Sequence, residues 1–164
     1  SNEAVAGREI AFTTTNGTRA LLRSVLADRV LMGAFANLGA VCDVLLEDSR
    51  PIHIVCAGTV GKISTEDCLF AGAVVGRLLG VSTESTDLAA AGIELCDAAR
   101  LVLSHWNSAM DTPDGLFQTM KAGSGGRNLM RLGLEADIRT AATLAQVDLV
   151  PEYLPQSRRI GRSN

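Results

Sequence analysis

Aromatic residues are scarce in this sequence, which has one Trp, one Tyr and four Phe among its 164 residues. Proteins that stack nucleic-acid bases depend on aromatic side chains, so this scarcity disfavours such a surface. The formal net charge is −3, and no tract of Lys and Arg is present that could follow a polyphosphate backbone. Both observations argue against a nucleic acid as a partner.

Long apolar runs and paired cysteines are also missing. No apolar run approaches the ~18 residues that cross a bilayer, and no signal peptide is evident. The four cysteines, Cys42, Cys56, Cys68 and Cys96, form no CxxC motif, and each lies in an apolar context. That context indicates buried thiols in a reducing compartment. We therefore expect a cytoplasmic protein with no membrane partner.

Histidine is rare, and several catalytic motifs are absent. His53 lies inside a predicted strand and His105 late in a predicted helix, so packing roles are favoured over catalysis for both. The sequence contains no Gly-x-Ser-x-Gly elbow, no triad-like order of Ser, His and Asp, and no Walker loop. Serine-hydrolase and P-loop chemistry are therefore disfavoured.

What the chain does contain is an alternation of strand-like and helix-like segments. At 164 residues and 47% hydrophobic, one domain with a real core is expected. Strands are predicted at Glu9–Thr14, Arg29–Ala34 and Ile52–Cys56, with helices at Thr18–Leu26 and Asn37–Leu46 between them. This order predicts an α/β domain with a mostly parallel sheet and right-handed crossovers.

The rest of the chain reads mainly as helix. A helix is predicted from Ser64 to Gly80, with Ser64 and Asp67 as a capping box and Gly80 as its stop. A second, alanine-rich helix is predicted at Leu88–Trp106 after a polar break at Ser82–Asp87.

Beyond the turn Asp111–Gly115, short helices are expected up to Gln146, broken at Gly123–Gly126 and at Gly133. Val147–Val150 is a last strand candidate, and the basic tail Ser157–Asn164 is expected to fray.

The first candidate site is the loop between the first predicted strand and the helix that follows. It consists of Thr13, Thr14, Thr15, Asn16, Gly17, Thr18 and Arg19. Helix N-terminal N–H groups beside a glycine can hold an oxyanion, and an arginine adds a forked cation suited to phosphate or sulfonate. The alternative is that Asn16 or Thr18 caps the helix and the threonines are strand residues. The residues alone leave both interpretations open.

The second candidate is the glycine-bearing loop Cys56–Asp67, which also joins a strand end to a helix start. Ligands gather at the carboxyl ends of parallel strands, so we expect this loop to open on the same side as the first. Glu66 and Asp67 diverge by about 100° on a helix but can both reach a site above its N-terminus. Magnesium takes one or two carboxylates with waters and substrate phosphate. Alternatively, Asp67 caps the helix and Glu66 offsets its dipole.

A third cluster, Ser124–Asn128, is a glycine-rich turn that opens a helix and carries Arg127 in the first turn. Arg127 could contact an anion. The alternative, a flexible turn with a solvent-facing arginine, is somewhat favoured on the residues alone.

Taken together, these residues resemble the 2-phosphosulfolactate phosphatase family. The resemblance extends along nearly the whole chain, and the threonine–asparagine–glycine–threonine run is its most specific part. The pieces that carry it are Thr13–Ala20, Val55–Gly58, Ser64-x-Glu66-Asp67, Glu94–Ala99, Leu132–Ile138 and Val150-Pro151. The resemblance implies a three-layer α/β/α fold.

The resemblance also implies an activity, the magnesium-dependent hydrolysis of (R)-2-phospho-3-sulfolactate to sulfolactate and phosphate, a step of coenzyme M biosynthesis in the family. The partner would then be a small anionic phosphate ester, and homo-oligomer formation is left open. Arg19, Glu66 and Asp67 are the expected catalytic residues, with Glu66 and Asp67 as metal ligands. The expected substrate-binding residues are Thr14, Thr15, Asn16, Gly17, Thr18, Ser64 and Arg127.

The sequence departs from the family in two places. Members carry a further N-terminal stretch with an aspartate-bearing strand, which we expect this single domain of 164 residues to lack. Many relatives have a histidine–glycine pair where Gly125-Gly126 stands here. These departures keep two other hypotheses open. One is a non-catalytic module that binds a phosphorylated or sulfonated metabolite. The other is an assembly role in which uncovered apolar surfaces pair with another chain.

Overall fold

The computed structural model describes residues 6–11, 13–82 and 93–163. Its helices are α2 Gly17–Arg23, α3 Leu38–Leu46, α4 Thr65–Ser82, α5 Asp97–Met110, α6 Gly115–Ala122, α7 Ser124–Arg131 and α8 Glu135–Ala141, with a 3₁₀ turn, η1, at Phe35–Asn37. Two strands follow, β1 Pro151–Leu154 and β2 Arg159–Arg162. Among these described helices, none has the length and apolar character needed to span a membrane.

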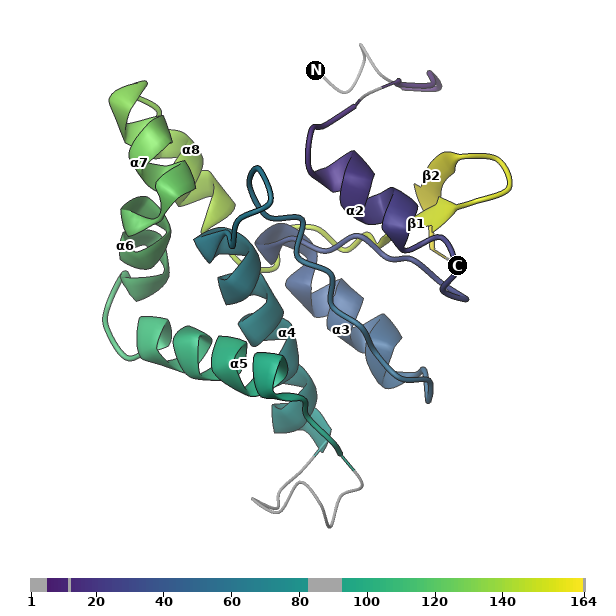
Figure 1. Ribbon diagram of the computed structural model, residues 1–164, viewed down its shortest axis with the longest axis horizontal. Coiled ribbons are helices and arrows are strands. Elements are labelled where there is room, and N and C mark those ends of the chain that lie inside the picture. The colour runs from purple at the N-terminus through teal and green to yellow at the C-terminus, as the bar shows by residue number, and fades with distance from the viewer. Residues whose placement is uncertain (1–5, 12, 83–92, 164) are drawn as a thin grey trace.

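The hydrophobic core forms around α4, against which α3, α5 and α6 pack (Figure 1). Leu69 and Val74 on α4 are almost fully buried, and Ile138 on α8 joins the same cluster. The ring of Phe35 lies edge-on to Phe70 at 5.5 Å between centroids. It also stacks on Trp106 at 6.0 Å, so these aromatic contacts connect η1 with α4 and α5.

Glycine allows α4 and α5 to approach closely. A Cβ placed on Gly72 would lie 2.1 Å from the carbonyl oxygen of Val102 and 2.7 Å from the Cβ of Trp106. Both distances are far shorter than a van der Waals contact, so only glycine fits at this crossing. The predicted stop at Gly80 is wrong, because α4 continues through it to Ser82.

The only β-ladder in the described residues is antiparallel and lies at the C-terminal end. Strands β1 and β2 pair with Glu152 opposite Gly161 and Tyr153 opposite Ile160. The predicted parallel sheet is therefore not formed in these residues. Of its three expected strands, Ile52–Cys56 and the described part of Glu9–Thr14 are extended chain without a ladder. Phe12 lies outside the described residues.

The third expected strand, Arg29–Ala34, makes one isolated antiparallel bridge, between Leu31 and Glu152. Its bonds are Met32 N–H to the Pro151 carbonyl, 2.8 Å, and Tyr153 N–H to the Val30 carbonyl, 2.9 Å. The buried Asn37 reinforces this contact, since its Nδ2 donates to the Met32 and Leu149 carbonyls and its Oδ1 accepts from Ala34 N–H. The segment is thus anchored along one edge.

Several predicted boundaries change as well. The tail Ser157–Asn164 does not fray over its described part, because Arg159–Arg162 forms β2 and Ser163 N–H bonds to the Val150 carbonyl. The last strand begins at Pro151, directly after the predicted Val147–Val150.

In the second half, α5 begins at Asp97, so the predicted helix Leu88–Trp106 starts too early over its described part. Residues 83–92, which include most of the predicted polar break, lie outside the described residues. The break at Gly133 and the helix after Asn37 are confirmed, whereas the predicted break Gly123–Gly126 shortens to Gly123, because α7 already begins at Ser124.

The α4 glycines yield a stability prediction. Gly72→Ala should lower the free energy of unfolding by about 1–3 kcal/mol, because the added methyl overpacks against a backbone carbonyl. Gly80→Ala in the same helix is the matched control, since a Cβ at Gly80 meets nothing within 4 Å. It should be stabilising by up to about 1 kcal/mol. Urea denaturation of both variants checks this, and equal effects would contradict the close α4–α5 packing.

Candidate active site

The first candidate loop is closed by two reciprocal hydrogen bonds. Thr14 N–H donates to Thr18 Oγ1, and Thr18 N–H donates to Thr14 Oγ1, both at 3.1 Å. Both hydroxyls therefore support the turn that begins α2, and the threonines of this loop lie in no β-strand, contrary to the alternative that made them strand residues. Asn16 stands at the N-cap position but makes no side-chain cap bond to its own helix.

Asn16 instead connects the first loop with the second. Its Oδ1 accepts a hydrogen bond from Val60 N–H at 3.3 Å, across 44 residues of sequence. The two loops that were expected to open on the same side are thus in direct contact. Val60 has a positive φ of 53°, so the second loop holds this amide in an uncommon backbone conformation.

Asp67 fixes the same loop from the start of α4. Its Oδ2 accepts a 2.6 Å hydrogen bond from Gly58 N–H, so this carboxylate holds the preceding loop. Gly58 has φ +68°, and a Cβ there would lie 2.6 Å from the Lys62 carbonyl oxygen. The glycine is therefore required both by the backbone conformation and by the close approach of Lys62. Ser64 is buried beside this turn at 3% exposure.

Glu66 lies against the third candidate cluster. A Cβ built on Gly125, in the first turn of α7, would lie 2.9 Å from Glu66 Oε1. The carboxylate therefore occupies the space that a side chain at position 125 would need. This position also places its negative charge at the N-terminal end of α7, where the helix dipole favours an anion.

Two arginines were expected in the site, Arg19 as a catalytic residue and Arg127 as a substrate-binding residue, and they differ in their surroundings. Arg127 is exposed and donates from Nη1 to the Ala122 carbonyl at the end of α6, so the structure assigns its guanidinium a capping contact. Arg19 is exposed on α2 and forms no ion pair within the part of the chain that the structure describes. Of the two, Arg19 is the cation that remains available.

A cavity of about 970 Å³ opens beside these loops, between α2 and the extended segments before α3 and α4. Three of the predicted site residues line it, namely Gly17, Glu66 and Asp67. The other predicted site residues do not line it, namely Ser64, Arg19, Arg127, Asn16 and the threonines.

His53 also lines the cavity and is exposed, so the sequence-based interpretation of it as a packing residue missed this position. Val55, Cys56 and Ala57 follow one another and line the same cavity, so no alternating pattern in the sequence could have identified His53.

The two thiols whose pKa the charge of Asp67 affects, Cys56 and Cys68, are not activated. Partial desolvation raises the pKa of Cys56 to about 11, and the charge of Asp67 adds to the increase. The pKa of Cys68 is raised for the same reasons, with desolvation the larger cause. Both thiols are therefore protonated at neutral pH, and a thiolate nucleophile is disfavoured in this cavity.

The carboxylates provide a modest donor set for a divalent cation. No group of three or more His, Cys, Asp or Glu residues suited to a metal occurs in residues 6–11, 13–82 and 93–163. Glu66 and Asp67 nevertheless line one cavity with hard oxygen atoms. Magnesium is commonly held by one or two carboxylates, with waters and substrate phosphate completing its shell, so this pair fits that ion.

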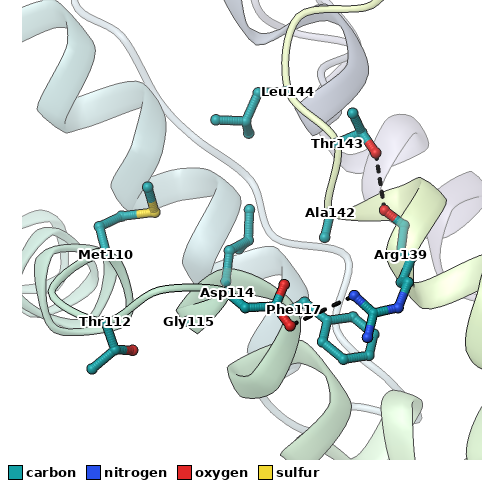
Figure 2. Close-up of a pocket in the computed structure, with 10 residues that line it drawn as sticks. Met110, Thr112, Asp114, Gly115, Phe117, Arg139, Ala142, Thr143 and Leu144 are labelled. Atoms are coloured by element: carbon teal, nitrogen blue, oxygen red, sulfur yellow. Dashed lines mark hydrogen bonds and ion pairs between the residues drawn. The ribbon is translucent and has the colours of Figure 1, made fainter.

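A second cavity, of about 460 Å³, lies between α5, α6 and α8 (Figure 2). Its one cation, Arg139, stacks on the Phe117 ring at 3.9 Å and pairs with Asp114 at 3.6 Å and Glu135 at 3.8 Å. Two carboxylates and a ring thus already satisfy this guanidinium. The arrangement joins α6 to α8 and offers no uncompensated charge for an anionic ligand.

The chain is similar to one known family over most of its length. A family model described as 2-phosphosulpholactate phosphatase matches residues 1–156. The chain belongs to this family. The match covers nearly all of the chain, as the sequence motifs predicted.

Curated relatives named "Probable 2-phosphosulfolactate phosphatase" include one from Caldanaerobacter subterraneus, 36% identical over 92% of this chain. Others come from Deinococcus radiodurans, 35% over 94%, and Synechococcus sp., 39% over 91%. The chain spans only 57–60% of the length of these three relatives.

The contact between Glu66 and α7 yields a second prediction. Gly125→Ala should leave the fold intact and displace the flexible Glu66 carboxylate, whereas Gly126→Ala should destabilise by about 1–3 kcal/mol or more. The difference arises because a Cβ on Gly126 would lie 2.1 Å from the Met120 carbonyl oxygen, which is backbone. Thermal unfolding distinguishes the two variants.

A double-mutant cycle isolates the Glu66 contact. In a Glu66→Ala background, Gly125→Ala should become stabilising by up to about 1 kcal/mol, as expected for alanine in place of glycine in a helix. An unchanged effect of Gly125→Ala in that background would show that the carboxylate does not occupy this position.

Proposed function

We propose that the protein is a phosphoric monoester hydrolase that cleaves 2-phosphosulfolactate, in its R form, to sulfolactate and phosphate with magnesium, the family's step in coenzyme M biosynthesis. The observation that carries the proposal is the meeting of three loops in a chain of this family. Asn16 contacts the Val60 amide, Asp67 the Gly58 amide, and Glu66 the start of α7.

The proposal includes a fold. We infer that the segments 8–11, 13–14, 29–34 and 52–57 belong to the parallel sheet of a three-layer α/β/α domain. A sheet in this place would bring the carboxyl ends of its strands to the Thr13–Arg19 and Cys56–Asp67 loops, where ligands of α/β proteins bind.

The proposal also includes a compartment. All four cysteines are free, which fits a reducing, cytoplasmic compartment.

Glu66 and Asp67 are the residues that would hold the magnesium ion. Bound there, the ion would neutralise charge on the phosphoryl group and polarise a coordinated phosphate oxygen. The hydrogen bond from Gly58 N–H to Oδ2 orients the Asp67 carboxylate, and Oδ1 takes no part in that bond. A carboxylate of this pair, or the cavity-lining His53, is the candidate to accept a proton from the attacking water.

Arg19 is the candidate for binding the substrate's oxyanions. It is exposed on the first turn of α2 next to Asn16, and no carboxylate among the described residues pairs with it. A free guanidinium can form two parallel hydrogen bonds to phosphate, sulfonate or carboxylate. We propose that it stabilises the equatorial oxygens during transfer, aided by Thr15 and the amides around Gly17.

A third prediction follows for Arg19. Arg19→Ala should lower kcat/KM by roughly 30- to 1,000-fold, which is about 2–4 kcal/mol of transition-state stabilisation, as for other lost oxyanion donors. The assay is phosphate release from racemic 2-phosphosulfolactate with magnesium. Arg100→Ala, an exposed arginine on α5, is the matched control and should keep full activity. A loss below tenfold for Arg19→Ala would remove Arg19 from the site.

A fourth prediction concerns the carboxylates. Glu66→Gln and Asp67→Asn keep the shape of each side chain and remove its charge, so both should raise the magnesium concentration needed for half-maximal phosphate release by at least tenfold. Glu135→Gln, which removes a carboxylate from α8 outside this cavity, should leave the magnesium dependence unchanged. Equal magnesium curves for all three variants would exclude the pair as ligands.

Two observations support the alternative of a non-catalytic binding module. Only two carboxylates line the cavity among the residues that the structure describes, and Thr14 and Thr18 already use their hydroxyls within the loop. Calorimetric binding of 2-phosphosulfolactate without phosphate release, with or without magnesium, would favour the module over the enzyme.

A further inference from the structure

The segment Arg29–Ala34 has a free backbone edge. Leu31 and Glu152 form a bridge flanked by the bonds of Met32 and Val30, so they are the non-hydrogen-bonded pair of this antiparallel contact. The N–H and C=O groups of Leu31 therefore point to the opposite edge. No partner for them occurs among the described residues.

The segment 52–57 has two free edges. Its residues are exposed and make no backbone hydrogen bond within the described parts of the chain. Its apolar side chains are exposed too, with Ile52 at 41%, Ile54 at 37% and Val55 at 57%. An apolar stretch with both backbone edges open is unusual in a folded protein, because unpaired backbone groups and exposed apolar surface are each unfavourable.

Helix α2 has an apolar face with nothing packed against it. It carries Ala20, Leu21 and Leu22, yet none of its residues is buried, and Leu22 is 56% exposed. In Figure 1, α2 stands apart from the other helices, with extended chain between it and α3. The 970 Å³ cavity is lined by α2 on one side and by Leu31, Val55 and Phe70 on the others.

We propose that the part of this cavity lined by α2, Leu31 and Val55, and not the part lined by Glu66 and Asp67, is a slot for one additional β-strand, inserted between segments 29–34 and 52–57. Such a strand would pair with the free edges of both segments and give the apolar face of α2 a surface to pack on. Since it would be covered on both faces, it should be a continuous apolar run of about five or six residues. A small ligand would satisfy neither row of backbone groups.

The occupant to which we assign the slot is a strand from the remaining part of the family's polypeptide. The three relatives described above each have about two fifths of their length outside the match to this chain. That length is ample for one strand. The inference concerns completion of the fold and goes beyond the proposed catalysis, so its test uses amide exchange and binding rather than phosphate release.

The test adds the unmatched part of the Caldanaerobacter subterraneus relative, as a separate polypeptide, to this chain and follows amide exchange by NMR. The amides of Leu31, Gly33 and Ile54 should exchange at least tenfold more slowly when it is added. The amides of Met32 and Tyr153 already have partners, so their exchange should change much less. This alternation along the chain is specific to strand pairing.

Val55→Asp places a charge in the slot and should abolish the protection. Its matched control is Val60→Asp, at a position 79% exposed and outside the cavity lining, which should retain the protection. Both side chains are exposed, so circular dichroism should show unchanged folding. No protection of Leu31 and Gly33, or equal protection in both variants, would overturn the proposal. Protection that rises with the concentration of this chain alone would also overturn it, since a second copy would then fill the slot.

Discussion

The buried amide of Asn37 is the interaction on which the rest of this arrangement depends. Three hydrogen bonds from one side chain connect Ala34, Met32 and Leu149, so two distant parts of the chain are fixed at one point. A buried amide of this kind has to be satisfied, and each of its bonds is strengthened by the absence of water. Phe35, which lies in the same 3₁₀ turn as Asn37, packs against the rings of Phe70 and Trp106.

One edge of Arg29–Ala34 is already hydrogen-bonded, so only its other edge can pair with a further strand. The bidentate pair of Arg29 with Glu152, at 3.1 and 2.8 Å, strengthens the anchored side and lowers the pKa of Glu152. Because the pKa of Glu152 lies below its unfolded value, this stabilisation is present at neutral pH and lost only as the pH falls through the folded-state pKa. The free side faces the cavity that also contains the carboxylates. The slot for the additional strand and the candidate active site are therefore two parts of one cavity.

The helices were largely predictable from the sequence, whereas the sheet was not. Local signals, such as the glycines at 123 and 133, end helices wherever the chain is placed, so the short C-terminal helices were found. A sheet depends on strands that meet from distant positions. The segments Arg29–Ala34 and Ile52–Cys56 have the apolar character of buried strands but lack neighbours on their free edges. The tail was misjudged for a related reason, since its pairing with Pro151–Leu154 depends on a turn and not on hydrophobicity.

For the candidate site, sequence reasoning identified the loops better than the roles of their side chains. The sequence predicted that the Thr13–Arg19 and Cys56–Asp67 loops would open on the same side, and the structure adds a direct contact between them, from Val60 N–H to Asn16 Oδ1. Spacing could not show that Thr14 and Thr18 bond each other, nor that Arg127 caps α6. Those roles are set by three-dimensional distances of a few ångströms. Gly125 was the hardest residue to interpret from the sequence, because glycine is needed there to make room for the Glu66 carboxylate, which lies 59 residues earlier in the chain. A position with no side chain of its own thus determines where a candidate metal ligand lies.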